Sequence, residues 1–76
     1  MNIPTILIFA LRHTLPRKTV GAGMVARAIR EMWPELNQAD RELIINDIKD
    51  ALADNHVGDR ITWERLIKEL KAEGLK

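Results

Sequence analysis

Side chains able to perform covalent or acid–base chemistry are scarce in this sequence. Its two histidines, His13 and His56, lie far apart, without the short spacing of a metal-binding pair or of an HExxH motif. The chain has no cysteine and no serine, so the usual nucleophiles of acyl transfer and the thiolate ligands of metals are missing. These residues predict no catalytic centre, no metal site and no cofactor.

The glycines and carboxylates do not change this prediction. Gly21 and Gly23 lack the spacing of G-x-x-x-x-G-K-[ST], and Ala26 stands where G-x-G-x-x-G requires a third glycine. Acidic residues are abundant, but on the solvent face of a helix they indicate no cleft for acid–base catalysis. The sequence therefore predicts that the protein is not an enzyme.

The sign of the charge changes along the chain. Residues 1–30 have a formal charge of +5, residues 31–59 of −6 and residues 60–76 of +2, although the whole chain carries only +1. This segregation is the most informative feature of the composition, because an ordinary surface mixes both signs. We expect it to create separate acidic and basic surfaces.

The acidic surface is expected on a helix in the middle of the chain. Asp47, Asp50 and Asp54 recur at intervals of three and four residues and share one side of that helix with Leu43. An apolar anchor ringed by carboxylates would suit a basic protein partner. A solvated helix face with one stray leucine is the simpler interpretation, and it requires no partner.

The basic surface could bind an anion or the phosphates of a nucleic acid. Its five members all precede residue 31: Arg12, Arg17, Lys18, Arg27 and Arg30. These bases could instead pair with the acidic helix of the same chain, or simply be solvated. No aromatic residues interleave with them for base stacking, and a helix-turn-helix would place a helix of net negative charge against DNA. Protein binding is therefore the first hypothesis, and nucleic-acid binding is the alternative.

Four segments must position these side chains. Their approximate bounds, set by prolines, glycines and helix caps, are 4–14, 19–33, 37–55 and 59–74. In the last three, apolar residues at intervals of three and four predict amphipathic helices, with Thr19 and Asn37 as N-caps and Gly58 as the stop of the third. The first segment is almost continuously apolar, so periodicity cannot distinguish a buried helix from a strand. We predict a helix, because a lone strand would have no pairing partner.

The predicted fold is all-α, a bundle of three to four helices forming a single domain over residues 1–76. A chain of 76 residues with 46% hydrophobic and 30% charged residues has the composition of one small globular domain. Trp33 and Trp63 are expected to supply much of its core, because aromatic side chains bury the largest areas. A homodimer would supplement so small a core, although nothing in the sequence requires one.

The apolar stretch near the N-terminus is predicted to be buried core. A signal peptide carries basic residues before its apolar stretch, whereas Arg12 follows this one. The stretch is also shorter than the roughly 20 residues that span a bilayer. We therefore predict no membrane association and a cytoplasmic location in a bacterial host, which the lack of cysteine fits.

Short motifs resemble those of a loose group of mostly uncharacterised phage and prophage proteins. The chain matches an L-R-x-x-L-x-R-x-T start over residues 11–19, a following Trp-x-x-Leu at Trp33, a central Asp-Ile at Asp47, and a closing Asp-Arg…Trp from Asp59 to Trp63. It departs from the pattern at Pro16, where glycine is usual, and at Val20, where an aromatic residue is frequent.

The resemblance implies a role rather than a set of functional residues. Small phage proteins of this kind often act by binding a host or phage protein, and some inhibit host defence, as anti-CRISPR proteins do. The expected function is thus that of a non-enzymatic phage accessory protein with a protein partner.

Overall fold

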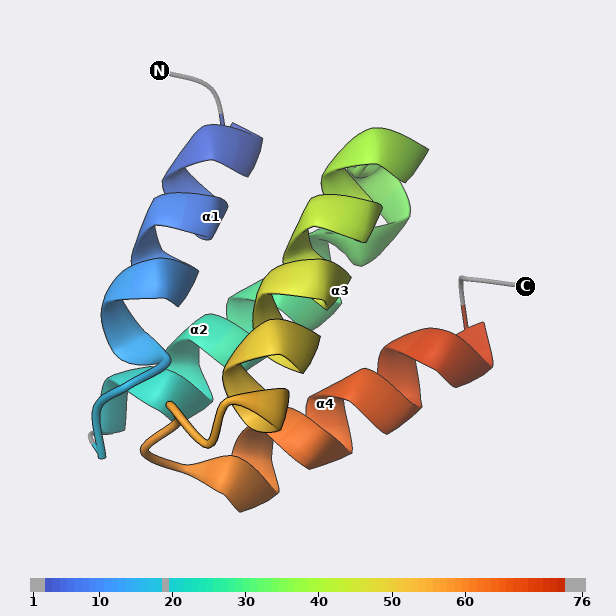
Figure 1. Cartoon of the computed structure of the whole chain (residues 1–76). Coiled ribbons are helices and arrows are strands. Elements are labelled where there is room, and N and C mark those ends of the chain that lie inside the picture. The colour runs from blue at the N-terminus through green and yellow to red at the C-terminus, as the bar shows by residue number, and fades with distance from the viewer. Residues whose placement is uncertain (1–2, 19, 74–76) are drawn as a thin grey trace.

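The computed structural model describes residues 3–18 and 20–73. Within these ranges the chain forms helices α1 (Ile3–Thr14), α2 (Val20–Met32), α3 (Gln38–Ala53) and α4 (Arg60–Glu73), with a short 3-10 helix, η1 (Trp33–Glu35), after α2 (Figure 1). The predicted all-α bundle is confirmed, and the first segment is a helix rather than a strand. The predicted cap Thr19 and the predicted end at residue 74 lie outside the described residues.

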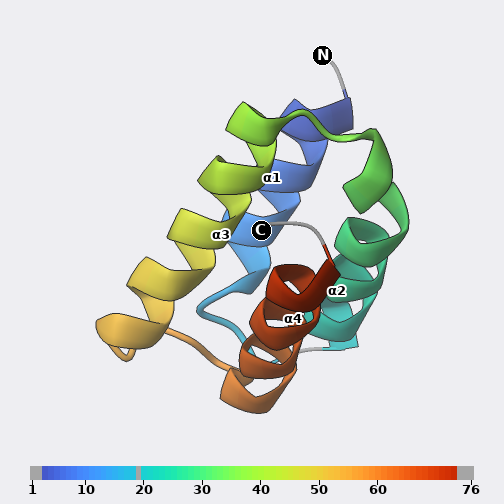
Figure 2. The same ribbon diagram turned by 90° about the vertical axis from the view of Figure 1, so that its right-hand side faces the viewer.

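The four helices pack as a ring around one core. The main contacts of α1 are with α2 and α3, and those of α4 are with the same two helices. Helices α1 and α3 lie side by side and run in the same direction (Figures 1 and 2). The largest fully buried side chains come from all four helices: Leu11, Ile29, Ile44, Ile48, Trp63, Leu66 and Leu70. The two predicted core tryptophans are both buried.

Local signals explain where α2 ends and α3 begins. Pro34 stands in the first turn of η1, where its missing N–H removes no helical hydrogen bond. Asn37 caps α3 as predicted, and its Oδ1 accepts a hydrogen bond of 2.8 Å from the backbone N–H of Asp40. The Arg41 guanidinium lies 5.5 Å from the centre of the Trp33 ring and donates to the Trp33 carbonyl at 3.1 and 2.8 Å. These contacts hold the α2–α3 connection against the start of α3.

The prediction that Gly58 terminates the third helix was wrong. Helix α3 ends at Ala53, and Asn55 takes the left-handed conformation with φ of 55°. The His56 N–H then bonds to the Ala51 carbonyl at 2.8 Å, which closes a Schellman-type helix end. Asparagine can replace glycine there, because its short polar side chain tolerates positive φ better than most.

Gly58 has a different role, which is to bring two loops into contact. Its N–H donates to the carbonyl of Leu15 at 2.8 Å. A Cβ atom at this position would lie 2.2 Å from the backbone carbon of Arg17 and 2.6 Å from the nitrogen of Lys18. Only glycine fits, because backbone atoms cannot rotate away.

The prediction that the apolar N-terminal segment is buried core was only partly right. Leu7 and Leu11 are buried, whereas Ile3, Ile6 and Phe9 are 54%, 50% and 71% exposed. A surface helix of a small bundle can bury only one side, so a helix that is apolar all round must leave apolar residues in water. Helix α1 therefore presents an uncovered apolar face.

Candidate protein-binding surface

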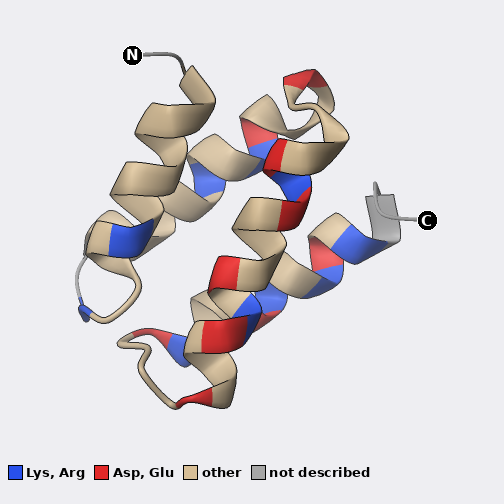
Figure 3. Cartoon of the chain, turned by 45° about the horizontal axis from the view of Figure 1, so that its top comes forward, with Lys and Arg blue, Asp and Glu red and all other residues tan. Residues whose placement is uncertain are grey.

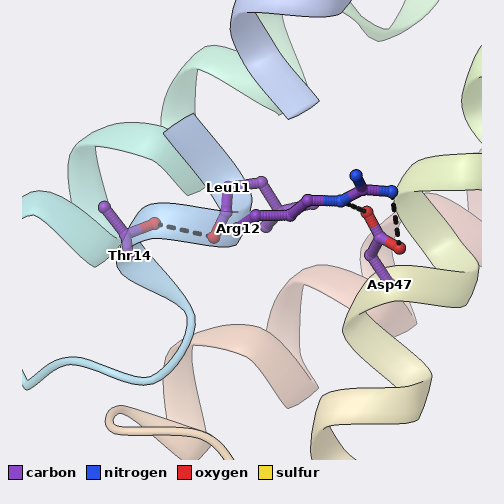
Figure 4. A network of polar contacts seen from close by, with 4 residues as sticks. All are labelled: Leu11, Arg12, Thr14 and Asp47. Atoms are coloured by element: carbon purple, nitrogen blue, oxygen red, sulfur yellow. Dashed lines mark hydrogen bonds and ion pairs between the residues drawn. The ribbon is translucent and has the colours of Figure 1, made fainter. Parts of the chain in front are cut away.

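An ion pair joins α1 to α3 at the centre of the candidate surface (Figure 4). The Arg12 guanidinium donates to Asp47 from Nε to Oδ2 at 2.9 Å and from Nη2 to Oδ1 at 3.5 Å. This hydrogen bonding, followed by the coulombic attraction of the carboxylate, raises the pKa of Arg12 above its ordinary value. One member of the predicted basic set is thus paired with one member of the predicted acidic set.

Among the described residues, no ion pair joins the other predicted bases to Asp47, Asp50 or Asp54. Arg27 pairs with Glu31 at 3.3 Å, and Arg30 pairs with Glu69 of α4. Arg17 donates to the carbonyl of His13 at the end of α1. Lys18 is exposed in the following loop. The five bases are therefore spread over several sides of the bundle instead of forming one basic surface.

The acidic side of α3 forms one wall of a groove of about 480 Å³. Its lining comes from the end of α1, the loop that follows it, the C-terminal half of α3 and the residues just after α3: Arg12, Leu15, Pro16, Asp47, Asp50, Ala51, Asp54 and His56. Red segments recur along α3, while the first turns of α1 carry no charge (Figure 3). The groove therefore combines apolar and carboxylate groups.

The sequence identified the carboxylates of the groove but not its apolar part. Leu43, the predicted anchor, is 47% exposed and does not line the groove. Leu15, Pro16 and Ala51 supply the apolar groups instead, and they come from two separate segments. Helical spacing predicts which residues are neighbours within one helix. It could not predict that residues of two separate segments lie together.

The groove continues into the apolar face of α1. A smaller pocket of about 190 Å³ is lined by Thr5, Ile8, Phe9 and Arg12, so Arg12 borders both hollows. Arg12 and Asp47 join two helices that run in the same direction, so the turns before them lie at the same level. One turn before the ion pair, α1 carries Ile8 and α3 carries Leu43. We call this combined area, from Ile6 and Phe9 on α1 to Asp50 and Asp54 on α3, the α1–α3 surface. Ile3 is excluded, because nine residues of helix place it on the side of α1 opposite Arg12.

The described residues show no grouping of side chains suited to metal chemistry. No three or more His, Cys, Asp or Glu residues among them lie together as metal ligands would, and His13 and His56 are both exposed. None of the described helices combines the length and apolar character needed to cross a bilayer.

Comparison of the chain with models of protein families, with curated proteins and with solved structures finds no significant match.

Proposed function

We propose that the chain is a small phage or prophage accessory protein that binds a host or phage protein through the α1–α3 surface, without chemistry of its own. The observation that carries this proposal is the uncovered apolar face of α1. Phe9 is 71% exposed and Ile6 is 50% exposed, although the domain has few large apolar residues to spare. Clustered apolar side chains of this kind commonly mark protein-interaction sites. Their burial by a partner would contribute about 3 kcal/mol to binding.

The phage origin within this proposal is supported by the resemblance in sequence. Two groups of its motif residues can be placed in the fold. Leu11, Leu15, Trp33, Leu36, Ile48 and Trp63 are buried core residues. Arg12 and Asp47, which belong to two separate motifs, form the ion pair at the centre of the α1–α3 surface. A role in phage growth, including inhibition of host defence, is therefore proposed together with this surface.

Nucleic-acid binding has weaker support. Arg12, Arg27 and Arg30 each lie beside a carboxylate of the same chain. A neighbouring carboxylate weakens the attraction of a base for phosphate, and electrostatic attraction supplies most of the affinity of such interfaces. Protein binding is the function that the geometry favours.

Substituting Ile6→Glu and Phe9→Glu together is expected to abolish capture of the partner from a lysate of the bacterial host. Both side chains are at least half exposed, so the thermal midpoint measured by circular dichroism should stay close to that of the unaltered protein. The measurement is affinity capture on the immobilised protein, with the retained proteins identified by mass spectrometry.

Ile61→Glu is the matched control. Ile61 is 70% exposed on α4, away from the α1–α3 surface, and its replacement should leave capture unchanged. Capture of the same protein by the Ile6→Glu/Phe9→Glu variant would contradict the proposal. So would the absence of any specifically retained protein.

A further inference from the structure

One side of α3 concentrates negative charge in its C-terminal half, while Lys49 carries the single positive charge there and lies outside this row. Asp47, Asp50 and Asp54 follow one another at helical spacing, and the last turn of the helix contains no basic residue. Like charges at this spacing destabilise a helix, and carboxylates near a helix C-terminus also meet the negative end of the helix dipole. A cation bound there would relieve both effects.

The chain itself relieves only part of this repulsion. Arg12 pairs with Asp47, but Asp50 and Asp54 are exposed, and no described side chain forms an ion pair with either. Arg60 lies at the end of the helix but does not pair with Asp50 or Asp54. Its Nη2 donates to the Leu52 carbonyl at 2.9 Å and to Asn55 Oδ1 at 3.0 Å. Two carboxylates therefore remain available to an outside cation.

The groove beside these carboxylates fits the stem of a long basic side chain. Leu15, Pro16 and Ala51 provide apolar lining next to Asp50 and Asp54, within a volume of about 480 Å³. Lysine and arginine bury their methylene groups against apolar surface while the charged head remains at its edge. A guanidinium or ammonium at the end of such a stem would meet the two free carboxylates, where charge-assisted hydrogen bonds are the strongest kind.

We infer that the α1–α3 groove receives a lysine or arginine from a basic, amphipathic segment of the partner protein. Neighbouring apolar residues of that segment cover Phe9, which lines the smaller hollow together with Arg12, and Ile6, the exposed residue one turn before Phe9 on α1. The inference rests on the proposed protein-binding function and specifies the partner's chemistry: cationic residues at one end of the contact and apolar residues at the other.

A defined peptide tests this inference without knowledge of the natural partner. The probe is a short fluorescent helical peptide with leucines towards one end and arginines towards the other, and its binding to the full chain is followed by fluorescence anisotropy. Asp50→Asn/Asp54→Asn is expected to weaken binding about tenfold, as the loss of two partly exposed ion pairs should. A peptide with glutamine in place of arginine should bind the unaltered protein about tenfold more weakly and respond little to the same substitutions.

Glu35→Gln/Glu42→Gln is the control, because it removes the same charge from two exposed positions outside the groove. It should bind the arginine peptide almost as tightly as the unaltered protein does. Equal weakening by the control and by Asp50→Asn/Asp54→Asn would overturn the inference, because charge anywhere on the chain would then suffice. Failure of the arginine peptide to bind the unaltered protein would overturn it too.

Capture from the host lysate separates this inference from the proposed function. If Asp50→Asn/Asp54→Asn retains the same protein as the unaltered chain while Ile6→Glu/Phe9→Glu loses it, the chain binds a protein and the basic partner segment is wrong. If the unaltered chain retains no protein, the proposed function fails. Loss of the same retained protein from both variants supports both.

Discussion

Replacing Gly58 with alanine is expected to lower the free energy of unfolding by about 3 kcal/mol, at the upper end of the range for overpacking. The new methyl group would lie 2.2 Å from the backbone carbon of Arg17 and 2.3 Å from its oxygen. The loops must separate to admit it, which would break the hydrogen bond between the Gly58 N–H and Leu15. Urea unfolding followed by circular dichroism measures the change.

Gly23→Ala is the matched control for this prediction. A Cβ atom at Gly23 would meet nothing within 4 Å, and the residue lies within α2. Because alanine favours a helix over glycine, this variant should gain up to about 1 kcal/mol. A Gly58→Ala protein as stable as the unaltered chain would show that the two loops do not pack as described.

Leu15 also lines the groove, so loss of the Gly58 contact should weaken peptide binding as well.

Truncation of Trp63 is the second change expected to have a large effect. This residue of α4 has a fully buried side chain. Trp63→Ala should therefore lower the free energy of unfolding by about 4 kcal/mol. A domain of this size has little more stability than that, so much of the variant should be unfolded at room temperature. Urea titration and the cooperativity of thermal unfolding measure the loss.

Trp63→Phe separates the volume of this side chain from its polarity. The indole Nε1 is buried and has no hydrogen-bond partner among the described residues. Phenylalanine keeps an aromatic ring in the core and removes that unsatisfied donor, so it should be far less damaging than alanine. Equal losses for the alanine and phenylalanine variants would show that packing of the six-membered ring contributes little.

The parts of the fold governed by local chemistry were predictable from the sequence. Asn37 caps α3 because its side chain reaches an N–H three residues along the same chain. Pro34 marks the end of α2 through its own backbone geometry. Apolar spacing placed Trp63, Leu66 and Leu70 on the buried side of α4. These signals need no knowledge of the other helices.

The groove and the loop contact could not be predicted in the same way. Gly58 was interpreted as a helix stop because glycine is common after helices. Its contact with Arg17 and Lys18 gave no signal, because these residues are 41 and 40 positions away in the sequence. The basic residues formed one group in the sequence, yet Arg12 faces α3 while Arg30 faces α4. The exposed face of α1 could not be predicted, because a segment that is apolar throughout has no periodicity to distinguish its solvent-exposed side from its buried side.

Photo-crosslinking in the bacterial host tests most directly whether the α1–α3 surface binds a protein. A photoreactive residue would replace Phe9 in one form of the full chain and Ile61 in another, since these positions are equally accessible at 71% and 70%. We predict one discrete protein adduct from position 9, crosslinked through the apolar part of a segment that also carries lysine or arginine, and none from position 61. Adducts that are the same from both positions, or absent from position 9, would contradict it.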